Sequence, residues 1–213
     1  MTSVAPHAPL QVKTLTLESP AGARITGFNA PFAPGLTLVV NEEGEHKSAL
    51  LHLLAGEAAP AAGSVRWGGL DVAALSAAQR AASIFWRDPR EPWPEVSPEQ
   101  WARQQAARHP GWRGADWQAL VPVLGLDEHR HKEMFRLSSG GRRKVLLAAA
   151  LASGAPLTLI DEPEAALDRP SIRQLRAALA AEARCCADSG RVIVVANYER
   201  VPDVPWGQVL RLA

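Results

Sequence analysis

Nearly continuous apolar runs alternate along this chain with segments that have helical spacing. Such runs are typical of strands buried on both faces of a sheet, and they lie at residues 36–40, 157–160 and 191–196. Helices are predicted between or after these runs, at residues 47–56, 142–153 and 171–186. Because strands and helices alternate, the pattern predicts an α/β fold whose mostly parallel sheet is covered on both faces.

Two further regions differ from this alternating core. Short strands bounded by Gly- and Pro-containing turns predict a small antiparallel β subdomain, at residues 10–17, 24–28 and 63–69. The middle of the chain is rich in Pro, Trp, Gln and Arg and predicts helices near 98–108 and 117–124. Since no internal repeat or low-complexity linker is visible, we predict one domain over residues 1–213, with a helical subdomain inserted at about 88–136.

Composition narrows the class of protein. The 213 residues carry 23 basic and 22 acidic side chains, so a net charge of +1 gives no general electrostatic case for nucleic acid. The two cysteines, Cys185 and Cys186, are adjacent and would bridge only with strain, which favours free thiols in a reducing cytosol. No signal peptide is visible, and the longest uncharged stretch, 145–160, is too short and interrupted to span a bilayer.

The residues that carry chemistry lie at the ends of two predicted buried strands. The first strand leads through a tight polar loop into Lys47-Ser48 at the start of a helix. Backbone N–H groups there would face a polyphosphate, while the lysine reaches the terminal phosphates and the hydroxyl holds Mg²⁺. The second strand ends at Asp161-Glu162, which would orient the Mg²⁺ shell and polarise an attacking water.

The order of several motifs makes the assignment more specific. Residues 137–145 (LSSGGRRKV) precede LIDEP at 159–163 and AALD at 165–168. This series resembles the signature motif, Walker B strand and D-loop of the ABC-type ATPases. The helix that begins with Lys47-Ser48 and the GSVRWGG segment at 63–69 are also similar to that family, so that the resemblance extends over about residues 10–210.

The resemblance implies a P-loop NTPase fold of the RecA-like type and a head-to-tail pair of subunits that bind ATP with Mg²⁺. It implies catalytic roles for Glu162 and Asn197, Mg²⁺ ligands or orienting groups in Ser48 and Asp161, and a D-loop position at Asp168. The implied contacts to the chain's own nucleotide are Asn41, Gly44, His46, Lys47, Ser48, Ala49 and Arg87. The implied signature residues, which would serve the partner's nucleotide, are Leu137, Ser138, Ser139, Gly140 and Gly141.

The chain departs from the family pattern at several of these positions. The loop N-E-E-G-E-H at 41–46 keeps only the middle glycine of G-x-x-G-x-G and adds three glutamates beside the expected phosphates. Arg87 replaces a glutamine, and Asn197 replaces a histidine with a side chain that carries no charge. No aromatic residue that would stack on adenine lies near Ser19. We expect weakened nucleotide binding, and both slow hydrolysis and binding without useful turnover remain open.

By this resemblance the chain is the ATP-binding subunit of a membrane transporter. It would lie at the cytoplasmic, inner face of the cell membrane and drive a separate permease, whose coupling helix would meet residues 88–136. The short length is similar to that of the small haem exporter subunits of cytochrome biogenesis. One alternative is a degenerate half of a heterodimer or a regulatory nucleotide-binding module, and another is an ABC domain used outside transport, in DNA repair or translation.

Three groups outside the motifs have a structural and a functional interpretation. Core packing is favoured over a partner-helix groove for the clustered tryptophans Trp86, Trp93, Trp101, Trp112 and Trp117. A solvated loop is favoured over a metal site for His129 and His131, which have no cluster of ligands with suitable spacing nearby. A surface or interface role is favoured over nucleic-acid binding for Arg142, Arg143 and Lys144.

Overall fold

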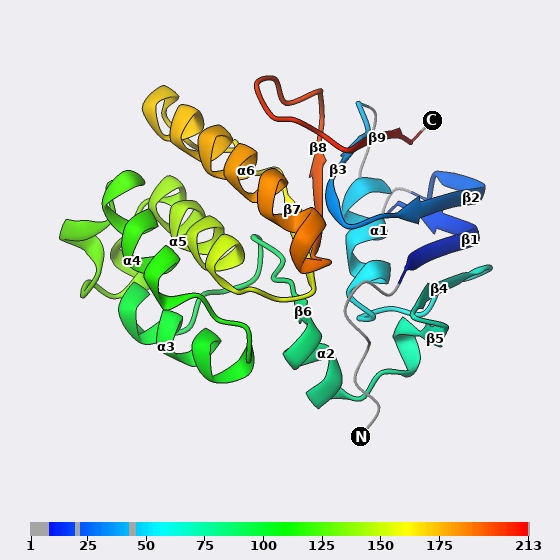
Figure 1. Cartoon of the computed structure of the whole chain (residues 1–213), viewed down its shortest axis with the longest axis horizontal. Helices are drawn as coiled ribbons and strands as arrows, with labels where there is room; N and C mark the ends of the chain where they lie inside the picture. The colour runs from blue at the N-terminus through cyan, green and yellow to red at the C-terminus, as the bar shows by residue number, and fades with distance from the viewer. Residues whose placement is uncertain (1–8, 20–21, 43–45, 213) are drawn as a thin grey trace.

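The computed structural model describes residues 9–19, 22–42 and 46–212, whose strands form two sheets (Figure 1). The central sheet has five strands in the order β6-β7-β8-β3-β9, and each neighbouring pair is parallel. In chain order its strands are β3 (Gly35–Val40), β6 (Ile84–Phe85), β7 (Leu157–Asp161), β8 (Val192–Asn197) and β9 (Gln208–Arg211). The predicted α/β class with a parallel sheet is confirmed.

A smaller antiparallel sheet packs beside this core in the order β2-β1-β4-β5. Its strands are β1 (Leu10–Glu18), β2 (Arg24–Phe32), β4 (Ser64–Trp67) and β5 (Leu70–Asp71). The second strand continues four residues beyond the predicted end at residue 28, because Ala30 and Phe32 bury their side chains beneath the sheet. The predicted strand and turn at 63–69 form β4 and the tight turn that leads into β5.

Helices cover both faces of the central sheet. The helices are α1 (His46–Leu54), α2 (Ala77–Ser83), α3 (Pro98–Arg108), α4 (Gly114–Val123), α5 (Ser139–Ala152) and α6 (Arg169–Ser189). Single 3₁₀ turns lie at η1 (Val72–Ala74), η2 (Asp127–His129) and η3 (Met134–Arg136). Figure 1 shows α5 and α6 on one side of β3, β7 and β8, with α1 and the antiparallel sheet on the other.

The central strands alternate between two hydrophobic cores, as expected for strands buried on both faces. In β8, Ile193 and Val195 face the core formed with α5 and α6, whereas Val192 and Val194 face the core shared with α1 and the antiparallel sheet. This arrangement holds the carboxyl ends of β3, β7 and β8 together at one edge of the sheet, where the loops that follow them meet.

The helical segment that follows β6 packs through its aromatic residues. Trp101 and Trp117 are buried, and Trp93 and Trp112 are partly buried against the same core. Trp86 packs against the other core. Core packing, the favoured interpretation of these tryptophans, therefore accounts for their contacts. Among the described residues, no group of His, Cys, Asp and Glu is arranged to hold a metal ion, and no helix is long and apolar enough to cross a membrane.

A close backbone approach joins the loop after α3 to the loop after α5. A Cβ added to Gly154 would lie 1.9 Å from the Gly111 carbonyl oxygen, and Gly154 itself has a φ of +59°. Beside this contact, Arg191 is buried and donates to the Ala150 and Leu151 carbonyl oxygens near the end of α5 and to Glu182 of α6. These contacts tie the helical segment, α5 and α6 to the sheet.

Candidate functional site

The edge formed by the carboxyl ends of β3, β7 and β8 carries most of the predicted site. Asn41 follows β3, Asp161 ends β7 and Asn197 ends β8, while α1 begins at His46 after the loop from β3. Gly44 and the glutamates at 43 and 45 lie outside the described residues. The topology therefore brings segments far apart in the sequence to one place, with the N-terminus of α1 among them.

Lys47 is buried, with 1% of its side chain exposed, and its charge has partners from two other loops. The Nζ atom lies 3.2 Å from Glu162 Oε1 and 3.4 Å from the centroid of the Tyr198 ring. A buried ammonium is stable only when it is paired, and these contacts provide a carboxylate and an aromatic face. The lysine is therefore held at the ends of β7 and β8.

Ser48 and Asp161 form a second buried pair beside Lys47. The serine hydroxyl donates to Asp161 Oδ2 at 2.7 Å, and Asp161 Oδ1 is buried without a hydrogen-bond partner among the described residues. Burial raises the pKa of Asp161 above its ordinary value, the Glu162 charge adds to this rise, and the Ser48 hydrogen bond and Lys47 oppose it. A hydroxyl and an unpaired carboxylate oxygen are hard oxygen ligands, so this pair fits Mg²⁺ chemically.

Glu162 has a left-handed backbone conformation, which is uncommon for a residue other than glycine. Its φ is +45°, and its N–H donates to the Ala196 carbonyl oxygen at 2.8 Å. The side chain is 28% exposed, so that one carboxylate oxygen contacts Lys47 while the group remains open to solvent. This combination of a fixed backbone and an accessible carboxylate is suited to polarising a water molecule.

An acidic cavity of about 540 Å³ opens beside these residues. Asn197 and Tyr198 line it together with the carboxylates of Glu42, Glu162, Glu164 and Glu199. Asn197 donates from Nδ2 to the Glu199 carbonyl oxygen at 3.0 Å, so its amide is already engaged within the loop after β8. Three of these carboxylates are paired with cations, Glu42 with Arg211, Glu162 with Lys47 and Glu164 with Arg176, so the repulsion of a polyphosphate by the cavity is partly balanced.

Arg87 is not among the residues that line this cavity, and the loop that follows it binds its guanidinium. Its guanidinium donates to the carbonyl oxygens of Glu91 at 3.2 Å and Pro92 at 2.7 Å, and its Cζ lies 4.5 Å from the centroid of the Trp93 ring. In this structure the Arg87 guanidinium is therefore not placed for its predicted contact with a nucleotide. The physical reason is that its own loop offers carbonyl oxygens and an aromatic face, which satisfy the guanidinium locally.

Three other predicted contact residues lie at the beginning of α1 or just before it. Asn41 donates from Nδ2 to the Leu212 carbonyl oxygen at 3.2 Å, and its buried Oδ1 has no partner among the described residues. His46 is buried, and its Nε2 lies 3.0 Å from the Ala23 carbonyl oxygen next to β2. Ala49 is partly buried in the first turn of α1.

The predicted signature residues 137–141 form the N-terminal end of α5 and contact the D-loop of the same chain. The Ser138 hydroxyl accepts from the Gly141 N–H at 3.0 Å and caps the helix. A Cβ added to Gly140 would lie 2.5 Å from the Ala166 carbonyl oxygen, so the two loops touch. Asp168 caps α6 and lies 3.1 Å from Lys144. Leu137 is buried and Ser139 is exposed.

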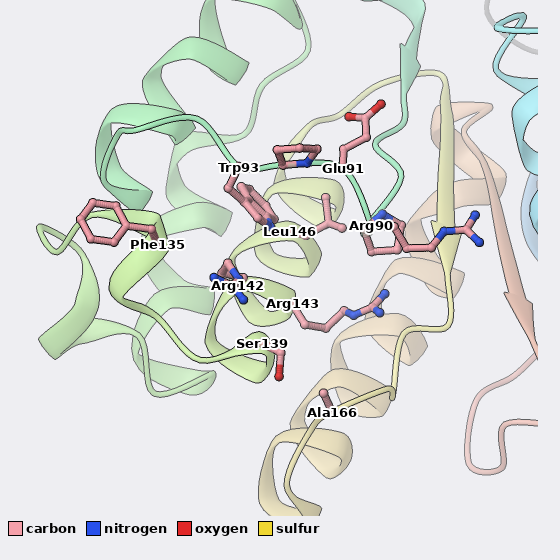
Figure 2. A pocket seen from close by; sticks show the side chains of 11 residues that line it. Arg90, Glu91, Trp93, Phe135, Ser139, Arg142, Arg143, Leu146 and Ala166 are labelled. Carbon is pink, nitrogen blue, oxygen red and sulfur yellow. The ribbon is translucent and has the colours of Figure 1, made fainter.

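A second cavity of about 350 Å³ lies between this end of α5 and the loop at 89–93 (Figure 2). Trp93, Phe135 and Leu146 contribute apolar side chains to it, and Phe135 is 62% exposed. Figure 2 shows Phe135 on one side of this cavity and Ser139 with Ala166 below it. The cavity therefore joins the helical segment to the signature and D-loop residues.

Sequence reasoning missed two residues that contact the site. Tyr198, next to Asn197, covers the Lys47 ammonium. Arg143 was expected at the surface or an interface, yet its Nη1 donates to the Asp161 carbonyl oxygen at 2.7 Å. The helical spacing could have indicated that Arg143 points toward the site. Arg143 precedes the buried residues Leu146, Leu147 and Ala150 on one face of α5. No comparable periodicity marks Tyr198.

Comparison with known proteins agrees with this geometry. Residues 35–165 match the family described as ABC transporter. The chain is 34% identical over 162 residues to the cytochrome c biogenesis ATP-binding export protein CcmA of Pseudomonas putida, covering 75% of each protein. It is 38% identical to the cobalamin import ATP-binding protein BtuD of Halobacterium salinarum, covering 70% of this chain but 39% of that relative.

Solved structures share the fold at lower sequence identity. A dimeric bacterial ABC transporter cassette has a TM-score of 0.73 with 18% identity, covering 95% of this chain and 94% of that chain. An ATP-binding protein of a putative ABC transporter from Pyrococcus furiosus has a TM-score of 0.72 with 17% identity, covering 96% and 97%. The family match over residues 35–165 and the 34% identity to CcmA over 75% of the chain establish that the chain belongs to the ABC transporter family, as an ATP-binding subunit.

Proposed function

We propose that this chain binds ATP with Mg²⁺ and hydrolyses it slowly, as one of two paired subunits that drive a separate membrane permease. The observation that carries the proposal is the convergence of Lys47, Ser48, Asp161 and Glu162 at one edge of the parallel sheet. These four side chains supply a cation for phosphate oxygens, two oxygen ligands for a divalent cation and an accessible carboxylate.

Each of these residues has a distinct role in the proposed reaction. Lys47 binds the terminal phosphates, and the N-terminus of α1 directs its first N–H groups at the same anion. Ser48 and Asp161 hold Mg²⁺, which neutralises charge on the phosphates when bound. Glu162 orients and polarises the attacking water and accepts its proton, while Asn197 donates a hydrogen bond near the terminal phosphate.

Three observations support slow turnover. Among the described residues, four glutamates but no lysine or arginine line the cavity next to Lys47, and their negative charge, which ion pairs balance in part for three of them, repels the phosphate chain. Arg87 is engaged by its own loop, so it is not available for the water or the metal in this conformation. Asn197 can donate a hydrogen bond but cannot carry a proton in the reaction.

The proposed partners follow from two surfaces at the N-terminal end of α5. Ser138, Gly140 and Asp168 lie together at the N-terminal end of the helix, where a second ABC subunit would place its own nucleotide. The helical segment at 88–136 and the cavity beside Phe135 would receive the permease at the cytoplasmic face of the membrane. Nucleic acid is not an expected partner, since the net charge is +1.

Calorimetric titration with Mg-ATP and a phosphate-release assay at high protein concentration test this function. We expect measurable binding and slow release of phosphate by the wild-type chain. Glu162→Gln should retain ATP binding and lose hydrolysis, because the amide cannot accept a proton, whereas the exposed Asp188→Asn should match wild type. Absence of binding at millimolar Mg-ATP would contradict the proposal, and unchanged turnover in E162Q would remove the assignment of Glu162.

A second candidate function is the non-hydrolysing half of a heterodimer. The observation that favours it is the contrast between an acidic cavity beside Lys47 and a well-capped signature helix at Ser138. This function predicts negligible phosphate release by the purified chain and a rise when a competent ABC subunit is added. Robust turnover by the chain alone would contradict it.

A further inference from the structure

The peptide group between Asp161 and Glu162 is held from both sides. Its carbonyl oxygen, which belongs to Asp161, accepts a hydrogen bond from Arg143 Nη1 at 2.7 Å. Its N–H, which belongs to Glu162, donates to the Ala196 carbonyl oxygen at 2.8 Å. Two hydrogen bonds at opposite ends of one planar group fix the orientation of that plane.

This fixed plane matters because Glu162 has an unfavourable backbone conformation. A φ of +45° costs free energy for a residue with a Cβ, and such conformations persist only where the surroundings enforce them. One contact that enforces this conformation is the hydrogen bond from the Glu162 N–H to the Ala196 carbonyl oxygen in β8. The other is the hydrogen bond from the Arg143 side chain to the Asp161 carbonyl oxygen. In this conformation the Glu162 carboxylate lies 3.2 Å from the Lys47 ammonium.

Arg143 reaches the Asp161 carbonyl oxygen from α5 through a long side chain. It lies on α5, partly buried, at the end of the face that carries Leu146 and Leu147 into the core. Figure 2 shows it extending away from Trp93 and Phe135, unlike its neighbour Arg142. Burial lowers the pKa of Arg143, while the nearby carboxylates of Asp161, Glu162 and Asp88 act against this decrease. Its charge thus faces the carboxylates of the site.

We propose that Arg143 is a positioning residue for Glu162. By holding the carbonyl oxygen of Asp161, it keeps Glu162 in its left-handed conformation and its carboxylate beside Lys47, where a water attacking the terminal phosphate is polarised. This inference rests on the proposed hydrolytic function, and it adds a residue that acts through Glu162 without touching the nucleotide.

The first test uses the nucleotide-free protein and does not depend on catalysis. Amide hydrogen exchange, measured by NMR, reports how firmly the Glu162 N–H is held. We expect Arg143→Met to speed exchange at Glu162 about tenfold or more, while exchange at Val195 in the core of β8 stays as in wild type. Arg80→Met is the matched control, because Arg80 is also a partly buried helical arginine that donates to a backbone carbonyl, that of Leu75.

The second test separates binding from turnover. For R143M we expect kcat to fall on the order of tenfold to a hundredfold, the effect of a misplaced catalytic group, with the KM for Mg-ATP changed less than about twofold. Arg143→Lys, which retains the charge and a donor, should recover part of kcat. In the Glu162→Gln background, which retains ATP binding, R143M should leave the affinity for Mg-ATP unchanged, because Arg143 acts through Glu162 and does not touch the nucleotide. A protein that only loses stability would not show this pattern.

The outcomes distinguish this inference from the proposed function. Unchanged exchange at Glu162, unchanged kcat, or a loss that appears in KM alone would overturn the positioning role. If wild type releases no phosphate, hydrolysis by this chain is excluded, and the exchange experiment still decides whether Arg143 holds the Glu162 backbone. If R143M fails to fold, R143K carries both measurements, with intermediate effects expected and wild-type behaviour in both overturning the proposal.

Discussion

The Tyr198 ring lies over the Lys47 ammonium, with 3.4 Å between Nζ and the ring centroid. Because Tyr198 is 51% exposed and belongs to the loop after β8, the ring can move without disturbing the core. Because the Lys47 side chain is only 1% exposed, we expect a phosphate chain that binds its ammonium to displace this ring. The contact therefore competes with nucleotide binding, in addition to the repulsion from the surrounding carboxylates.

Removal of the Tyr198 ring should strengthen nucleotide binding. We expect Tyr198→Ala to bind ATP about 3- to 30-fold more tightly than wild type, the range that corresponds to one cation–π contact. Tyr198→Phe retains the ring and should match wild type, and Val123→Ala, exposed on α4, controls for loss of apolar surface. Calorimetric titration measures the difference. Equal or weaker binding by Y198A would show that the ring does not compete.

Neutralising the buried carboxylate of Asp161 should stabilise the nucleotide-free protein. Burial raises the pKa of Asp161, so the native state disfavours its ionised form more than the unfolded state does. The stabilising contribution of this group is therefore present below the ordinary carboxyl value of 3.8 and is lost as pH rises through the raised value. We expect Asp161→Asn to increase the free energy of unfolding at neutral pH, although it removes a proposed Mg²⁺ ligand.

Denaturant titrations of wild type and D161N across a pH series measure this effect. The difference should be largest near neutral pH and shrink as pH approaches 3.8. Asp188→Asn, at the exposed end of α6, is the control and should leave stability unchanged. A D161N protein less stable than wild type at neutral pH would show that the Asp161 charge is needed to hold Ser48 and Lys47.

His109 should make the protein sensitive to mild acid. Burial, with smaller effects from the Arg108 and Arg191 charges, lowers the pKa of His109 from 6.5 to about 4. The unfolded chain therefore takes up this proton first, and stability is lost as pH falls from 6.5 to about 4. Over this pH window, protonation of His109 in the unfolded chain lowers the free energy of unfolding by up to about 3 kcal/mol.

The measurement is the free energy of unfolding at about pH 7.5 and about pH 5, where this single linked proton predicts a loss of about 2 kcal/mol. His109→Gln has no titrating ring and should show a smaller loss between the two conditions. His131→Gln removes an exposed histidine and should behave as wild type. Equal acid sensitivity in wild type and H109Q would assign the loss to other groups.

The close approach of Gly154 to Gly111 should make position 154 intolerant of any side chain. Gly154→Ala places a Cβ 1.9 Å from the Gly111 carbonyl oxygen at a φ of +59°, so backbone must move. We expect a loss of about 2–4 kcal/mol in the free energy of unfolding, a size reached by strain and overpacking. Gly125→Ala is the matched control, because Gly125 has a φ of +68° with nothing within 4 Å.

For G125A only the backbone strain remains, which costs about 1–2 kcal/mol. The comparison of the two variants by chemical denaturation therefore isolates the cost of the contact from the cost of the left-handed backbone. Equal losses in G154A and G125A would mean that the two loops separate without penalty, and that the joint between the helical segment and α5 is loose.

Features with a local cause were predictable from the sequence. The strands β3, β7 and β8 and the helix α3 were expected because apolar runs and helical spacing act over a few residues. The short strand β9 was missed, since four residues of alternating burial carry little periodic signal. The first turn of α5 was also missed, because Ser139-Gly140-Gly141 has low helix propensity and forms a helix only under the Ser138 cap.

The sequence by itself determined which polar side chains follow the buried strands, because each apolar run ends where those side chains begin. It therefore named Lys47, Ser48, Asp161 and Glu162 together. Only the tertiary structure decided where the long polar side chains point. Arg87 turned to its own loop, Arg143 reached the Asp161 carbonyl oxygen and Tyr198 covered Lys47. The orientation of each of these side chains depends on partners distant in sequence or on loop geometry. The pattern of residues along the chain does not indicate either one.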